Sequence, residues 1–258
     1  MPTVALTLSY DGAPFSGYAK QTCGGVQRAV TVQGELENAL QLVYRRPVET
    51  VCAGRTDAGV HALGQVVSFE LTPDEYGERS LEKLMRSING IAPEAMAVTA
   101  ARLAPDGFSA RFDARTREYR YRVVDGPVRP IFLAKCSWWV RETLDRGAMR
   151  EAADLLLGEH DFKSFCLAAS AEGKNTLREL TEVSLTEEMQ MGESCLCVRV
   201  VGNAFLHNMV RIVVGTLVDV GAGRRDPAWV ADVLEARQRS AAGQTAPPEG
   251  LVFWRVEY

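Results

Sequence analysis

The residues best able to do chemistry stand in one short segment, Gly54-Arg55-Thr56-Asp57-Ala58-Gly59-Val60-His61. Asp57 lies in a loop of small residues that joins two apolar segments, 48–53 and 65–71. The glycines allow a bulky ligand to approach the acid closely, and the neighbouring Arg55 favours the ionised carboxylate. An ionised, accessible Asp is a candidate nucleophile or general base. The alternative is an Asp that only hydrogen-bonds a turn.

Hydrophobic periodicity predicts the elements that position this loop. Alternating apolar residues predict strands at 4–10, 65–71, 116–124, 180–186, 195–201 and 251–258. Helical spacing predicts helices at 31–44, 81–88, 144–157, 205–220 and 227–234. Thr31 is able to cap the first of these helices. The predicted strand at 116–124 places Tyr119 and Tyr121 on one face and two arginines on the other.

Composition indicates an ordinary globular protein. The chain has 258 residues, of which 47% are hydrophobic and 24% are charged, with a formal net charge of −4. We expect no signal peptide and no transmembrane segment, because the first residues and the apolar runs fit neither. The six cysteines form no CxxC pair, so we expect free thiols and a cytoplasmic location. Cys195 and Cys197 alternate along a predicted strand and are read as core residues.

Arginine is concentrated locally although the whole chain is acidic. Residues 108–122 contain five arginines against two acids, and Arg224-Arg225 forms a second group. A planar, bidentate guanidinium suits phosphates and stacked bases. A GC-rich genome would explain the total of 24 arginines against 5 lysines, but it would not explain the clustering. The clusters predict contact with nucleic acid.

The order of these motifs resembles the tRNA pseudouridine synthase A family along nearly the whole chain. The matching segments are Tyr10-Asp11-Gly12, Phe15-Ser16-Gly17-Tyr18, 31–37, 53–61, Phe108-Ser109-Ala110-Arg111-Phe112, Arg117-Glu118-Tyr119-Arg120-Tyr121, 157–162, 203–211 and Glu249-Gly250-Leu251. One departure concerns Tyr18, where many members carry Trp or Phe, and Ala19, where Gln is frequent. This departure bears on RNA contact and not on the chemistry.

The resemblance implies an α+β fold of two similar α/β subdomains that share an extended, mainly antiparallel sheet with a central basic cleft. We expect residues 1–105 to form the subdomain with the Asp loop and residues 106–258 to complete the cleft. The implied activity is isomerisation of uridine to pseudouridine at positions 38, 39 and 40 of the tRNA anticodon stem-loop. A homodimer that works without cofactor or metal is also implied.

The resemblance further assigns roles to individual residues. Asp57 is the implied nucleophile, and whether it attacks C6 or C1′ or removes the C2′ proton stays open. The implied substrate-binding residues are Tyr119, Arg55, Arg211 and Leu251. By the resemblance, Tyr119 stacks on the uracil and Leu251 closes the pocket. Arg55 fills the gap left by the flipped base or clamps the backbone, and Arg211 pairs with the Asp. Taken alone, Tyr119 is typical of a core residue and Arg211 of a solvated helix face.

Three other points complete the predictions. His61, His160 and His207 lack metal-like spacing and are read as structural or RNA-contacting. A non-catalytic RNA-binding protein of the same fold is the main alternative function, against which the intact set of Asp57, Tyr119 and Arg211 speaks. A hydrolase with Asp57 as general base would need a second carboxylate or an activated water, and no paired-carboxylate motif is present.

Overall fold

The chain folds into two compact units. The computed structural model describes residues 2–23, 26–27, 29–167 and 172–258. Unit 1 comprises Met1–Arg115 together with Phe253–Tyr258, and unit 2 comprises Thr116–Val252. The expected boundary after residue 105 lies ahead of this division, and the domains 1–105 and 106–258 stay a prediction.

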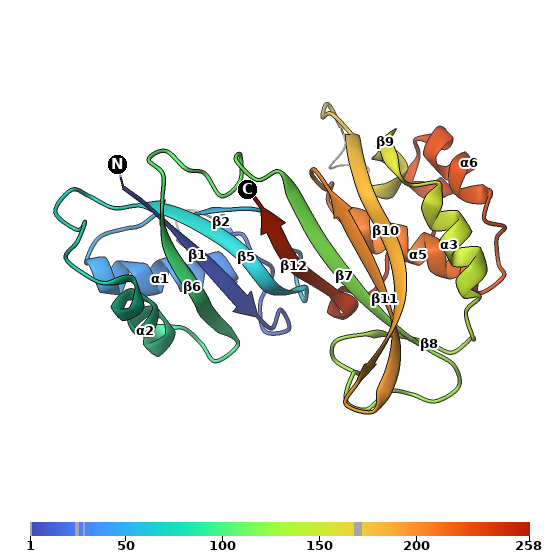
Figure 1. The fold of residues 1–258 in the computed structure, drawn as a ribbon, viewed down its shortest axis with the longest axis horizontal. Coiled ribbons are helices and arrows are strands. Elements are labelled where there is room, and N and C mark those ends of the chain that lie inside the picture. The colour runs from blue at the N-terminus through green and yellow to red at the C-terminus, as the bar shows by residue number, and fades with distance from the viewer. Residues whose placement is uncertain (1, 24–25, 28, 168–171) are drawn as a thin grey trace. The chain divides into compact units, whose positions relative to one another are not determined.

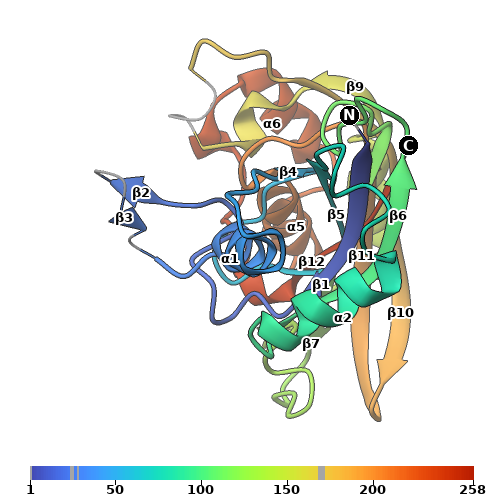
Figure 2. The same cartoon turned by 90° about the vertical axis from the view of Figure 1, so that its left-hand side faces the viewer.

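Unit 1 is built on a sheet in which β1 pairs antiparallel with both β5 and β6. The order across the sheet is β6 (Met96–Ala104), β1 (Thr3–Tyr10), β5 (His61–Glu70) and then residues 253–257 of β12 (Leu251–Glu257), and β4 (Val51–Cys52) also pairs with β5. Helices α1 (Val32–Tyr44) and α2 (Leu81–Ile91) pack against each other, and α2 packs on β6 (Figures 1 and 2). Strands β2 (Thr22–Cys23) and β3 (Val26–Gln27) form a separate pair.

The sequence dictates where α1 begins and ends. The Thr31 hydroxyl accepts a hydrogen bond from the backbone N–H of Gly34 and so satisfies one of the free donors of the first turn. Leu36 and Leu40, one helical turn apart, are fully buried. The helix stops at Arg45, whose φ of 57° lies in the left-handed region. The predicted helix at 31–44 and its cap are confirmed.

Unit 2 also contains a run of mainly antiparallel strands. Its order is β7 (Thr116–Asp125), β11 (Glu193–Gly202), β10 (Leu177–Gln190) and β9 (Gly158–Asp161), and β8 (Trp138–Val140) runs parallel to β7. The helices are α3 (Arg146–Asp154), α5 (Met209–Gly221) and α6 (Trp229–Ala236), with 3-10 turns η1 (Phe162–Phe165), η2 (Arg239–Ala241) and η3 (Pro248–Gly250). Helix α5 contacts α3 and β7, and α6 contacts η1 (Figure 1).

The predicted fold class is confirmed, since both units combine helices with a mainly antiparallel sheet. The predicted strand at 116–124 is also confirmed, as β7, but both of its faces carry buried side chains, since Arg122 and Val124 are buried as well as Tyr121 and Val123. In the parts of the chain that the structure describes, no helix has the length and apolar character needed to cross a bilayer.

Four predicted helices have wrong ends. The helix predicted at 81–88 continues to Ile91 as α2. The helix predicted at 205–220 begins only at Met209, because Asn208 has a left-handed φ of 63° that a right-handed helix does not accommodate. The helix predicted at 144–157 covers only Arg146–Asp154, since Asp145 caps it and Gly158 opens β9. The helix predicted at 227–234 runs from Trp229 to Ala236. Strand β6 was not predicted.

Candidate active site

The Asp57 loop connects β4 to β5 in unit 1. Asp57 is half-buried, Thr56 is buried and Arg55 is exposed. The backbone N–H of Val60 donates to the carbonyl of Asp57 at 3.2 Å, which closes a turn. Gly59 stands within this turn with a φ of 78°, a conformation that favours glycine. Asp57 can therefore belong to a turn and still be a nucleophile or general base, because this turn is closed by backbone atoms.

A second loop, residues 11–18, lies directly against the Asp57 loop. The N–H of Tyr18 donates to the Thr56 carbonyl at 2.9 Å. A Cβ placed on Gly17, whose φ is 101°, would lie 3.2 Å from the same carbonyl oxygen. A Cβ placed on Gly12 would lie only 2.1 Å from the carbonyl oxygen of Val60. The two glycine-containing motifs are therefore packed backbone to backbone.

Buried side chains hold the Asp57 loop from the sheet side. The Tyr10 hydroxyl and Thr56 Oγ1 are hydrogen-bonded at 2.8 Å, and both residues are buried. Burial raises the pKa of the Tyr10 phenol far above its ordinary value, so this group stays neutral. Gln65 Nε2 donates to the Gly54 carbonyl at 2.5 Å from a fully buried position on β5. These contacts hold the loop at Gly54 and at Thr56, the residue directly before Asp57.

His61 links the two loops at the other end. Its Nδ1 accepts the N–H of Gly12 at 3.1 Å and lies 3.1 Å from Asp11 Oδ1. This agrees with a structural role for His61. His160 has a local contact, with Nε2 2.8 Å from the Leu157 carbonyl.

The strand that precedes the Asp57 loop carries a half-buried cysteine. Cys52, on β4, has its thiol pKa raised to about 11, chiefly because burial disfavours the thiolate. The charges of Arg55 and Arg111 act in the opposite direction on this thiol.

In unit 2, Tyr119 and Tyr121 have different surroundings. The ring of Tyr119 meets the ring of Phe205 edge to face, with centroids 4.9 Å apart. Tyr121 is fully buried and its hydroxyl donates to the Pro247 carbonyl at 2.7 Å. Burial also raises the pKa of Tyr121 well above its ordinary value. Both tyrosines are buried, Tyr119 with 7% of its surface exposed and Tyr121 with none, so Tyr121 is the more deeply buried of the two.

Arg211 lies in the first turn of α5, against the segment 238–250. Its Nε donates to the Ala246 carbonyl at 2.7 Å, and its Nη1 donates to Asn208 Oδ1 at 2.7 Å. The Ala246 N–H returns a bond to the Arg211 carbonyl at 3.1 Å. A Cβ on Gly215, one turn later, would fall 1.8 Å from the Gln244 carbonyl oxygen. This face of α5 is covered by backbone, so the solvated-face reading is wrong.

Leu251 follows η3 at the start of β12 and is buried. A Cβ on the preceding Gly250 would lie 2.5 Å from the Tyr121 ring, so Leu251 enters the strand immediately beside that tyrosine. The predicted site residues thus form two groups. Asp57 and Arg55 belong to unit 1, and Tyr119, Arg211 and Leu251 belong to unit 2.

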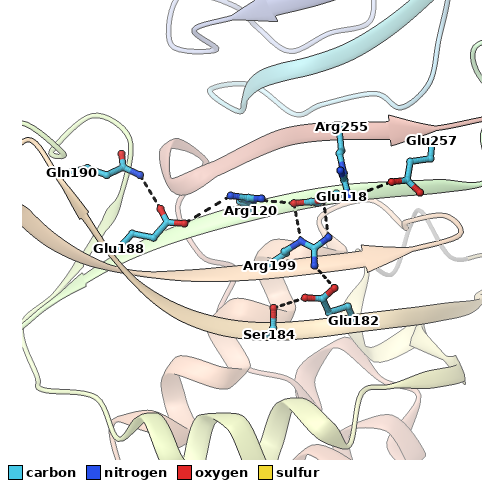
Figure 3. Close-up of polar contacts among 9 residues, drawn as sticks. All are labelled: Glu118, Arg120, Glu182, Ser184, Glu188, Gln190, Arg199, Arg255 and Glu257. Carbon is cyan, nitrogen blue, oxygen red and sulfur yellow. Dashed lines mark hydrogen bonds and ion pairs between the residues drawn. The ribbon is translucent and has the colours of Figure 1, made fainter.

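Part of the predicted arginine cluster is engaged in ion pairs. Glu118 lies between Arg120 and Arg199, with Nε of each arginine 2.9 Å from Glu118 Oε1 (Figure 3). Arg199 also pairs with Glu182, and Arg122 is buried. Burial acts to raise the pKa of the Glu118 carboxyl, but the bonds and charges of Arg199 and Arg120 outweigh it and leave that pKa lowered.

The second arginine group is engaged as well. Arg224 pairs with Asp219 and Glu142, each at 3.1 Å. Arg225 lies over the ring of Trp229, 5.0 Å from its centroid. Of the two arginines in this group, Arg225 is therefore the better candidate for phosphate contact, because two carboxylates already pair with Arg224. Nothing in the spacing of the sequence distinguishes it from Arg224.

Sequence reasoning also missed the support of the Asp57 loop. Tyr10 was placed in a predicted strand and in a family motif, and Gln65 at the start of another predicted strand, but neither was given a part in holding the Asp57 loop. Periodicity would place either side chain on a face, but it carries no signal for a partner 46 or 11 residues away.

Comparison with known proteins bears on the whole chain. The sequence model of the tRNA pseudouridine synthase family matches residues 7–113 and 152–258. The chain is 43% identical over 255 residues to tRNA pseudouridine synthase A of Pseudomonas aeruginosa, covering 99% of this chain and 85% of that protein. It is 44% identical over 259 residues to the protein of that name from Streptomyces griseus, covering 99% and 87%. The Brevibacillus brevis protein of that name is 40% identical over 260 residues, covering 100% of both.

Proposed function

Because this chain belongs to the tRNA pseudouridine synthase family and is a tRNA pseudouridine synthase, we propose that it isomerises uridines 38, 39 and 40 of the anticodon stem-loop with Asp57 as the nucleophile. The observation that carries the proposal is the construction of the Asp57 loop. Backbone and side-chain bonds from Tyr10, Tyr18 and Gln65 hold it in one conformation. Such preorganisation is what a reacting carboxylate requires.

The reaction breaks the bond from uracil N1 to C1′ of the ribose and forms a bond from C5 to C1′. A proton leaves C5 and a proton is gained at N1, so no atom or electron is gained or lost overall. We therefore propose a reaction that uses no redox cofactor and no metal. The freed uracil has to turn while it is held, which requires the nucleotide to be flipped out of its stack into a closed pocket.

Asp57 can act in three ways on this substrate. It can attack C6 of the uracil, attack C1′ of the ribose, or remove the C2′ proton to give a glycal. All three require an ionised carboxylate. The half-buried position of Asp57 suits a group that meets a substrate and is then shielded from water.

The unit 2 residues supply the other proposed contacts. We propose from the family resemblance that Arg211, whose guanidinium is held by Ala246 and Asn208, is the basic residue that keeps the reacting carboxylate ionised against desolvation. Tyr119 stacks on the target uracil and Leu251 closes over it. Arg55, which is exposed, fills the gap in the stack or clamps the backbone. The resemblance to the family supports these assignments.

We further propose a cytoplasmic homodimer. The cysteines at positions 52, 136, 166, 195 and 197 are free thiols, which suits a reducing compartment. The stem-loop and elbow of a tRNA extend further than one chain of 28.3 kDa covers comfortably, so two copies are expected to serve one tRNA.

Tritium release from tRNA that carries 5-tritiated uridine tests the proposal. The Asp57→Asn variant keeps the shape and hydrogen bonds of the side chain but lacks the carboxylate. Release is expected to fall to background while tRNA still binds. Asp154→Asn, at an exposed position of α3, is the matched control and is expected to retain wild-type release. Appreciable turnover by Asp57→Asn would sink the proposed role of this residue.

A further inference from the structure

The turn at residues 108–113, which joins β6 to β7, is unusually well anchored for a surface segment. Within it, the Ser109 N–H donates to Asp113 Oδ2 at 2.8 Å and the Asp113 N–H returns to the Ser109 carbonyl at 3.1 Å. The Phe112 N–H donates to Ser109 Oγ at 3.3 Å. All three bonds join residues within the turn and so restrict its conformation.

The turn is also tied to the sheet of unit 1. The N–H of the fully buried Ala110 donates to Ser68 Oγ at 3.0 Å, and the Ala110 carbonyl accepts from the Tyr258 hydroxyl at 2.9 Å. The rings of Phe108 and Tyr258 meet edge to face at 4.8 Å, and the Arg102 guanidinium lies over Phe108 at 4.9 Å. Phe108 thus belongs to a packed cluster.

Phe112, in the same turn, is exposed instead. Its side chain is 78% exposed, the highest value among the large apolar residues of the described chain. The Arg111 guanidinium lies 5.2 Å from the centre of its ring. The neighbouring Asp113 and Arg115 are exposed. A single aromatic ring among charged residues is not a contiguous apolar patch of the kind that binds another protein.

This turn lies near the Asp57 loop. Ser68, whose hydroxyl accepts the Ala110 N–H, is the pairing partner of Val51 on β4, and β4 leads directly into the Asp57 loop. Phe112 follows Arg111 directly. An exposed ring with a guanidinium beside it, near the residue that acts on a nucleotide, has the chemistry of a base-stacking platform.

We propose that Phe112, with Arg111 beside its ring, stacks an unpaired nucleotide base of the RNA substrate next to the target uridine. The inference rests on the proposed function, because it takes the substrate to be a tRNA stem-loop. Stacking on an aromatic ring tolerates any base, since every base has a π-face. Phe112 therefore contributes affinity and position for the loop, and it adds no preference for one base.

The test is binding of a tRNA anticodon stem-loop RNA with 2-aminopurine in its loop, at fixed salt. Stacking quenches the fluorescence of this base. The variants are Phe112→Trp, which keeps a ring, and Phe112→Leu, which keeps an apolar side chain without one. Phe112→Leu is expected to weaken binding by about fivefold or more and to lose the quenching, whereas Phe112→Trp is expected to retain both. Phe132→Leu, at another exposed phenylalanine, in unit 2 (60% exposed), is the matched control and is expected to bind like wild type.

Wild-type affinity and quenching in Phe112→Leu would overturn the inference. So would a loss of self-association by light scattering in Phe112→Leu, which would make this surface a protein interface. Tritium release by the wild-type protein tests the proposed function separately from the stacking role of Phe112. An inactive wild type that still binds and quenches would refute the proposed function alone, and an active wild type with an unaffected Phe112→Leu variant would refute the stacking alone.

Discussion

Gly12→Ala is expected to disable the enzyme from a position that does not touch the reacting atoms. The added Cβ would fall 2.1 Å from the Val60 carbonyl oxygen and 2.8 Å from the carbonyl carbon of Gly59. Real Cβ atoms essentially never approach closer than 3.0 Å, and both neighbours are backbone, which cannot swing aside as a side chain does. The Asp57 loop and the 11–18 loop must therefore separate by about 1 Å, and misplacement of a reacting group by 1 Å can cost about 100-fold in rate.

The measurement is the kcat of tritium release at saturating tRNA. We expect a loss of about 100-fold for Gly12→Ala, because the displacement affects the reacting carboxylate more than the affinity for tRNA. Gly90→Ala is the matched control, since a Cβ on this helical glycine of α2 meets nothing within 4 Å. Thermal unfolding of both variants checks that the loss is local. A folded Gly12→Ala protein with kcat within threefold of wild type would show that the packing of these loops does not position Asp57.

Three further outcomes are expected. Arg211→Lys should be less active than wild type, and Arg211→Ala nearly inactive, in tritium release, because lysine keeps the charge but loses the planar fork; near-normal activity of Arg211→Ala would contradict the proposed pairing. Arg225→Ala should flatten the dependence of log binding constant on log salt by roughly one unit, and Arg224→Ala by less, since two carboxylates already hold Arg224; equal slopes for the two variants would count against this distinction. Because the Glu118 carboxyl has a lowered pKa in the folded state, its contribution to stability is present above the ordinary value near pH 4.3 and is lost as pH falls through the lower folded value. Chemical denaturation should therefore find Glu118→Gln less stable by about 1–3 kcal/mol at pH 7 and by progressively less below about pH 4, and a gap that does not change with pH would be the contrary result.

Local patterns in the sequence were enough to place most elements. The Thr31 cap with its buried leucines, and the alternation of Tyr119, Tyr121 and Val123, each depend on residues close in sequence. The predicted start of α5 was wrong because Phe205 continues the apolar spacing of the helix. In the structure Asn208 has a left-handed φ, so the helix begins after it, and the ring of Phe205 packs against Tyr119. Periodicity does not register a single backbone reversal of this kind.

The sequence predicted the residues of the candidate site, but it did not predict the hydrogen bonds that hold the Asp57 loop in place. The spacing around Asp57 identified the loop, and the family resemblance named its expected partners. The bonds from Tyr10 and Gln65 join residues distant in sequence and depend on how β1 and β5 pair. The arginines of β7 looked alike in sequence, but Glu118 becomes buried between Arg120 and Arg199 only when β7 and β11 align.

The division of the chain has a consequence for synthesis on the ribosome. Unit 2 is one continuous stretch, whereas unit 1 needs Phe253–Tyr258 in addition to the residues up to Arg115. Gly64 of β5 has to be a glycine because Trp254 of β12 lies against it, with the Trp254 carbonyl oxygen 2.3 Å from where a Cβ would stand. The unit that carries Asp57 is made first and completed last. A nascent chain that has not reached β12 lacks the strand beside β5, and β5 begins where the Asp57 loop ends, so the unit with this loop is completed only after β12 has been made.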